Sequence, residues 1–210
     1  MNLKPMHKRF DGYLPIVIDT ETSGLNPLTN ALLEIAAINI KLDNGIFTPG
    51  EDFVCHVLPF EGAKIDEAAL QINKIDPYHP FRFAIDEHKA LEKLFEFSSK
   101  MLQEQKCRRA VLVGHNAHFD LSFIQAAMKR CKIKKSPFHA FTCFDTATLA
   151  GLAYGKTILA KALTTANIDF DKDKAHSAIY DAQKTAELFC DILNRIRFKT
   201  PEEPASGTFF

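Results

Sequence analysis

The feature that most constrains this chain is a strand of the buried type that ends in two acidic residues. Residues 14–20 read LPIVIDT, and Asp19 and Glu21 stand two positions apart at the end of this apolar run. On a strand, residues i and i+2 project from the same face, so the two carboxylates would lie roughly 6–7 Å apart. Like charges at that distance repel by about 2.5 kcal/mol at an effective dielectric near 20. The pair therefore needs a hard divalent cation or a bound proton, unless one acid merely caps the following turn.

Three strand-like segments followed by alternating helices and strands predict an α/β fold. Residues 14–20, 31–42 and 52–58 have the composition of strands, and the turn sequence DNG at residues 43–45 separates the last two. Such a succession favours an antiparallel meander, and AVLVG at residues 110–114 predicts a further buried strand. Apolar spacing of three and four predicts helices at residues 65–73, 87–105, 119–131, 146–154, 158–167 and 177–197. We expect a ribonuclease-H-like mixed sheet, with a three-strand meander and parallel strands, flanked by helices.

Length and composition indicate one domain. The chain has 210 residues, 46% of them hydrophobic, which is enough for a core, and no linker or repeat divides it. We expect a single domain over residues 1–198 and a flexible tail over residues 199–210. The formal net charge is zero, so a site for a polyanion needs local segregation of charge. Five scattered cysteines, no secretion signal and no membrane-spanning apolar run predict free thiols in a cytoplasmic protein that has no membrane partner.

Two further acidic motifs occur where a ligand site is expected. Asp120 ends the sequence GHNAHFD, where a predicted strand gives way to a helix, and open α/β sheets bind ligands at this edge. Helix capping is the alternative role for Asp120. Asp181 falls in the first turns of the last predicted helix, beside its apolar stripe, and needs a compensating cation or donor. His176 falls in the preceding loop, where an imidazole could take a proton from water or simply lie at the surface.

Taken together, the motifs resemble those of the DEDDh exonucleases, a family with the ribonuclease-H-like fold. The patterns DxExxG at residues 19–24, GHNAxFD ending at Asp120, and HxAxxD at residues 176–181 occur in the family's order and spacing. Agreement continues between the motifs, in LLEIAAI at residues 32–38 and FDT at residues 144–146. The resemblance is greatest to a branch of the family that trims transfer RNA.

This resemblance implies a 3′–5′ exoribonuclease that releases nucleoside 5′-monophosphates by two-metal hydrolysis. It assigns Asp19, Glu21, Asp120 and Asp181 to two Mg²⁺ ions, with Mn²⁺ as an alternative, and His176 to the proton of the attacking water. Two such ions can lower the pKa of that water and stabilise the leaving oxygen. The implied substrates are RNA 3′ ends, in transfer RNA and ribosomal RNA precursors, with single-stranded DNA as a further candidate.

Aromatic rings are expected to hold the terminal bases, because stacking contributes about 1–3 kcal/mol per base without base preference. The resemblance makes Phe119 and Phe141 candidates for this contact. Two further positions at which the family usually has Phe are occupied by Leu25 and Ile72. Aliphatic side chains can wedge against a base but have no planar face, so the family's base discrimination is not implied for this chain.

Basic residues gather in short clusters that could bind phosphate or could simply be solvated helix ends. The candidates are Arg9, Arg108, Arg109, Lys132, Lys134 and Lys135. In the family branch, comparable patches lie away from the catalytic carboxylates, and a homodimer brings one subunit's patch to the other's site. The resemblance therefore implies a homodimer that binds RNA through salt-dependent phosphate contacts.

Two other functions fit the same motifs. A DNA 3′–5′ exonuclease of the proofreading type shares all three, and digestion of RNA and DNA side by side would separate it from a ribonuclease. A non-catalytic module could keep the fold in order to bind nucleic acid. The set of four carboxylates and one histidine argues against that module, because an acidic cluster repels phosphate.

Overall fold

The computed structural model describes residues 5–196, so the tail predicted for residues 199–210 lies outside the described residues. Within this range a five-stranded sheet has the order β3-β2-β1-β4-β5. Its strands are β1 (Tyr13–Thr22), β2 (Leu32–Asp43), β3 (Ile46–His56), β4 (Arg109–Gly114) and β5 (Phe138–Asp145). The pairings β1–β2 and β2–β3 are antiparallel, whereas β1–β4 and β4–β5 are parallel. The predicted mixed sheet with a meander is confirmed.

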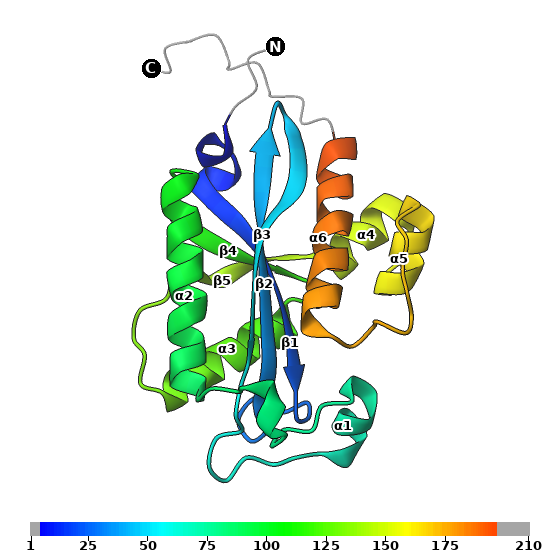
Figure 1. The fold of residues 1–210 in the computed structure, drawn as a ribbon. Coiled ribbons are helices and arrows are strands. Elements are labelled where there is room, and N and C mark those ends of the chain that lie inside the picture. The colour runs from blue at the N-terminus through cyan, green and yellow to red at the C-terminus, as the bar shows by residue number, and fades with distance from the viewer. Residues whose placement is uncertain (1–4, 197–210) are drawn as a thin grey trace, which may run out of the picture.

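Helices cover both faces of this sheet (Figure 1). In the described part of the chain they are α1 (Glu67–Asn73), α2 (Glu87–Glu104), α3 (His118–Arg130), α4 (Thr146–Tyr154), α5 (Leu159–Ala166) and α6 (Ala178–Arg195). Helices α2 and α3 lie on one side, α6 with α4 and α5 lies on the other, and α1 lies beyond the C-terminal end of β1. All six predicted helices are present, with ends that differ by at most two residues.

The central strand β1 is covered on both faces, which explains its nearly continuous apolar sequence. Leu14, Ile16 and Val17 are 0% exposed, and Ile18 is 1% exposed. The apolar run gives way to acidic residues only near the C-terminal end of the strand, where side chains emerge from the core. This end of β1 is therefore the place where the fold can present polar chemistry on a rigid element.

Strand β3 begins earlier than the sequence predicts. Asn44 and Gly45 form a two-residue hairpin turn with φ of 51° and 81°, which joins β2 directly to Ile46. Pro49 interrupts the strand pattern but is tolerated because β3 is an edge strand. The expected start at residue 52 is therefore wrong, although the predicted turn is confirmed.

Sequence patterns do not predict β5. This edge strand pairs with β4 through Ala110–Phe138 and then Leu112–Cys143, so residues 139–142 bulge out of the ladder. The bulge breaks the alternation by which a strand is identified. It also carries Phe141, whose side chain is 87% exposed.

The main core lies between the sheet and helices α2, α3 and α6, and a smaller apolar cluster joins α4, α5 and α6. The five cysteines are free thiols, as expected. Among the residues that the structure describes, no helix has the length and apolarity needed to span a bilayer. The expected single domain over residues 1–198 stays a prediction.

Candidate active site

Three carboxylates from opposite ends of the described chain meet at the end of β1. Asp19 and Glu21 project from one face of the strand, and Asp181 reaches them from the first turn of α6. One carboxylate oxygen from each residue lies within 4.8 Å of the other two, and the three residues are half-buried. Two carboxylates on a rigid strand and one on a helix end thus converge on a single point.

Asp120 lies beside this cluster without belonging to the group of three. It occupies the first turn of α3 and is only 5% exposed. Its Oδ1 accepts a hydrogen bond of 2.8 Å from the hydroxyl of Thr20, the residue between the two acids of β1. Of the neighbouring charges, that of Asp120 acts most strongly on Asp19. The structure therefore couples Asp120 electrostatically to the cluster.

Burial raises the pKa of each carboxyl group in the site, and repulsion among the site's own acids adds to this rise for Asp19 and Glu21. The pKa of Asp19 lies well above its usual range, because of burial first and then the charges of Asp120 and Asp181. Burial, with the charges of Asp181 and Glu34, raises the pKa of Glu21 to about 7. Burial also raises the pKa of Asp120 to about 7. Near neutral pH the negative charges of the ionised carboxylates are therefore not balanced within the site. Bound protons or a cation can supply the missing positive charge.

An unpartnered oxygen of Asp181 also fits a cation. Its Oδ1 is buried and has no hydrogen-bond partner, while Oδ2 accepts the backbone N–H of His176 at 2.9 Å. Buried polar atoms normally have a partner, and the available ligands are all carboxylate oxygens, which hard divalent cations prefer. The residues present therefore fit a divalent ion such as Mg²⁺.

His176 lies in the loop before α6, as the sequence predicts. Its φ of 66° is in the left-handed region, and its side chain is exposed. The hydrogen bond to Asp181 anchors its backbone rather than its ring. The imidazole is therefore free to face a ligand at the rim of the acidic cluster.

The residues expected to contact bases differ in accessibility. Leu25, Ile72 and Phe141 are 82%, 56% and 87% exposed. Phe119 is half-buried, and its ring lies 4.9 Å from that of Phe123 between centroids. Phe119 thus belongs partly to the core, whereas the other three are available to a ligand.

Asn73 is a site residue that sequence reasoning does not identify. At the end of α1 it is 9% exposed, and its Nδ2 donates to the carbonyl of Thr22 at 3.1 Å. Its side chain also acts on Glu21, where it opposes the rise in pKa that burial causes. The available signal was a polar residue at the end of a predicted helix, but only the tertiary contact shows its partner.

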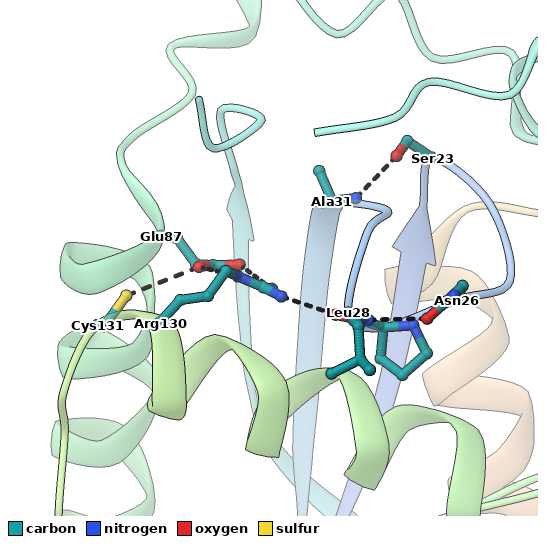
Figure 2. A network of polar contacts seen from close by, with 8 residues as sticks. Ser23, Asn26, Leu28, Ala31, Glu87, Arg130 and Cys131 are labelled. Carbon is teal, nitrogen blue, oxygen red and sulfur yellow. Dashed lines mark hydrogen bonds and ion pairs between the residues drawn. The ribbon is translucent and has the colours of Figure 1, made fainter. Parts of the chain in front are cut away.

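A polar network holds the loop between β1 and β2 (Figure 2). Arg130, the last residue of α3, donates to both carboxylate oxygens of Glu87, at 3.0 and 2.7 Å. It also donates to the carbonyl of Pro27 at 2.7 Å, and its guanidinium lies 4.2 Å from the ring centroid of Phe60. The loop that carries Leu25 is therefore attached to α2 and α3.

The basic candidates at the start of the strands lie far from the carboxylates. Arg109 pairs with Tyr13 where β4 and β1 begin, on the order of 20 Å before Asp19 at the rise of an extended strand. Arg108 stacks on the Tyr13 ring at 4.7 Å, and Arg9 stacks on that of Phe47 at 5.4 Å.

The remaining basic candidates follow α3. Lys132, Lys134 and Lys135 are exposed. Lys134 and Arg109 line one cavity of about 170 Å³. The structure thus brings the acids together and leaves basic residues elsewhere on the same chain.

The fold is that of exonucleases, and the acidic cluster lies within it at the end of β1. A family model described as Exonuclease (RNase_T) matches residues 16–189, a range that contains all four carboxylates and His176. The chain belongs to this exonuclease family. It is 52% identical to the ribonuclease T of Vibrio parahaemolyticus over 192 residues, which are 90% of each chain. It is 51% identical to the ribonuclease T of Yersinia enterocolitica over 92% of this chain and 91% of that relative.

Solved structures agree on the fold. Exonuclease I of E. coli in complex with a dT13 oligonucleotide matches with a TM-score of 0.66 at 18% identity, over 85% of this chain. The match covers 40% of that enzyme, so this chain spans about two fifths of its length. The nuclease domain of 3′hExo, a DEDDh family member bound to rAMP, matches with a TM-score of 0.69 at 17% identity, over 87% and 92% of the two chains. The expected ribonuclease-H-like fold is confirmed.

Proposed function

We propose that this protein is a 3′–5′ exoribonuclease that uses two Mg²⁺ ions to trim the 3′ ends of transfer RNA and other stable RNAs. The observation that carries the proposal is the oxygen cluster of Asp19, Glu21 and Asp181. It occurs in a chain 52% identical to a ribonuclease T over 90% of its length. The cytoplasm is the proposed location, which the free cysteines support.

Each acidic residue has a proposed role. Asp19, Glu21 and Asp181 would hold one divalent cation, and Asp120 would help Asp19 to hold a second. When bound, such ions activate water and stabilise charge on the phosphate and the leaving oxygen. The protein fixes its carboxylates on β1, α3 and α6, so that the reacting phosphate meets a preorganised site.

His176 is the proposed general base. It would take the proton of the attacking water, and its ring is suited to this step because it is exposed and accessible to a ligand. Attack on the terminal phosphodiester then releases a nucleoside 5′-monophosphate. Phe119, Phe141, Leu25 and Ile72 are the proposed contacts with the terminal bases.

The separation of basic residues from the carboxylates supports a homodimer. In that arrangement the arginines and lysines of one protomer would hold the RNA that enters the acidic site of its partner. Sedimentation velocity at micromolar concentration, combined with activity at the same concentration, tests this assembly. A fully active monomer would exclude it.

The test of function is digestion of a structured RNA with a short 3′ overhang, read at nucleotide resolution. Asp19→Ala and Asp181→Ala should abolish Mg²⁺-dependent release of nucleotides and leave a folded protein. Asp52→Ala, which removes an exposed acid on β3, is the matched control and should retain activity. RNA cleavage by either site variant at the wild-type rate would contradict the two-metal assignment.

A DNA substrate of the same design separates the alternatives. Faster digestion of DNA than of RNA would favour a DNA exonuclease. Absence of nucleotide release from both polymers in Mg²⁺ and in Mn²⁺ would favour a binding module. We expect release from RNA, because the named relatives of high identity are ribonucleases.

A further inference from the structure

A fifth carboxylate, Glu34, lies directly across the sheet from Glu21. The register of β1 and β2 pairs Glu21 with Glu34, and the register of β2 and β3 pairs Glu34 with His56. Directly paired residues project from the same face of a sheet. The three side chains therefore form a row that starts at the acidic cluster. Like charges in such a pair are destabilising. A charged Glu34 therefore lowers the stability of the sheet unless a positive charge compensates it.

Glu34 is a buried charge rather than a surface residue. It is 7% exposed and interrupts the apolar sequence LLEIAAI. The Nδ1 of His56 lies 3.5 Å from its Oε2. The guanidinium of Arg82 is bound to the carbonyl of Leu33 at 2.6 Å and interacts electrostatically with Glu34. Because a buried carboxylate needs compensation, a neutral side chain would be easier to accommodate at this position.

The charge of Glu34 acts on the candidate metal ligands. It is paired with Glu21 across the two strands, so the two carboxylates repel each other directly. Within the described residues, Glu34 does not belong to the group whose oxygens lie within 4.8 Å. It therefore acts from beside the cluster. A charge that disfavours further negative charge at this site favours a divalent cation there by the same interaction.

We propose that Glu34 is a positioning residue that raises the affinity of the Asp19–Glu21–Asp181 site for divalent cations, with His56 next to it in the row. The proposal rests on the proposed function, because it requires that the cluster bind a cation. Groups just outside the ligand shell of metal sites typically change metal affinity by about 10–100-fold. Sequence reasoning treats Glu34 only as an acid within a strand, because its partners come from two other strands.

Binding of Mn²⁺ to the full chain, measured by electron paramagnetic resonance without RNA, tests the proposal. Glu34→Gln keeps the shape of the side chain and removes its charge, whereas Glu34→Asp keeps the charge on a shorter side chain. Glu51→Gln is the control, because Glu51 lies on β3 and pairs with Lys100 at 3.0 Å, away from the cluster. We expect Glu34→Gln to weaken Mn²⁺ binding about 10-fold or more. Glu34→Asp should remain closer to wild type, and Glu51→Gln should be unchanged.

Activity supplies a second measurement. Glu34→Gln should raise the Mn²⁺ concentration needed for half-maximal RNA digestion and leave the rate at saturating Mn²⁺ near that of wild type. Equal Mn²⁺ affinity in Glu34→Gln and wild type would overturn the proposal, as would weaker binding by Glu34→Asp than by Glu34→Gln. If circular dichroism shows that Glu34→Gln is unfolded, a 10-fold loss in Glu34→Asp would overturn it. A wild-type protein that binds no Mn²⁺ would instead contradict the proposed function.

Discussion

Arg130 and Glu87 join the last residue of α3 to the first residue of α2, with Nη2 and Oε1 2.7 Å apart. Their side chains are 21% and 7% exposed, so the pair is largely shielded from solvent. Because Arg130 also binds the carbonyl of Pro27, the pair supports the loop that carries Leu25. The packing of two helices thus determines where a proposed base contact lies.

Removal of Arg130 should be strongly destabilising. Arg130→Met leaves the buried carboxylate of Glu87 unpaired, and we expect a loss of about 3 kcal/mol in the free energy of unfolding. Arg195→Met, which breaks the exposed pair with Asp191, is the control and should cost less than about 1 kcal/mol. Urea denaturation measures both. Similar losses in the two variants would mean that the Arg130–Glu87 pair contributes no more than a surface contact.

Without metal, stability should fall as the pH rises from about 4.5 to about 7. Burial raises the pKa of Glu21 from 4.5 to about 7 in the folded protein, so the folded state binds more protons than the unfolded state between these values. By linkage, the free energy of unfolding then decreases as the pH rises. The contribution of Glu21 is fully present below its unfolded pKa and amounts to at most about 3 kcal/mol.

Urea denaturation in EDTA at pH 5 and pH 7.5 tests this sign. Mg²⁺ should restore stability at pH 7.5, because a bound cation replaces the lost protons. Glu21→Gln should flatten the dependence in EDTA, since its amide does not titrate. A wild-type dependence as flat as that of Glu21→Gln would show that the pKa of Glu21 is not raised in the folded protein.

Aromatic rings at positions 25 and 72 should change base recognition. Leu25 and Ile72 are exposed, so Leu25→Phe and Ile72→Phe add planar surface without disturbing the core. We expect the double variant to bind single-stranded RNA about 10-fold more tightly, since one added stack contributes about 1–3 kcal/mol. Fluorescence anisotropy with oligonucleotides that differ in their last base measures affinity and preference. Unchanged values for every base would mean that neither position contacts the bases.

Gly24 should not tolerate a side chain. A Cβ at this position would collide with the side chains of Asp66 and Asn30, so Gly24→Ala must displace the segment that follows Glu21. We expect a loss of about 1–3 kcal/mol in stability and a raised KM for RNA. Gly62→Ala is the comparison, because a Cβ there meets nothing within 4 Å although φ is 79°. A KM for Gly24→Ala equal to that of Gly62→Ala would show that the segment does not help to bind RNA.

Local patterns assign each acid to its strand or helix, whereas the resemblance to the exonuclease family is what predicts that the acids form one site. Asp19 and Glu21 share a strand face through a period of two, and Asp181 lies in the first turn of a helix with clear apolar spacing. The bulged edge strand β5 is not predicted, because its pairing depends on β4 rather than on alternation within its own sequence.

The other contacts that the sequence does not predict join residues from different strands and helices. Glu34 faces Glu21 only through the register of two strands, and Thr20 reaches Asp120 across 100 positions of sequence. The partners of these residues depend on the tertiary fold, and no periodic signal in the sequence records them.

The acidic cluster combines residues of β1 and α6, and this has a consequence for biosynthesis. Glu21 comes from the first strand and Asp181 from the last helix of the described chain, so a ribosome makes Asp181 only after all the other helices and strands described here. We therefore expect an incomplete chain, still attached to its messenger RNA, to have no nuclease activity. The order of synthesis would withhold nuclease activity until α6 has been made.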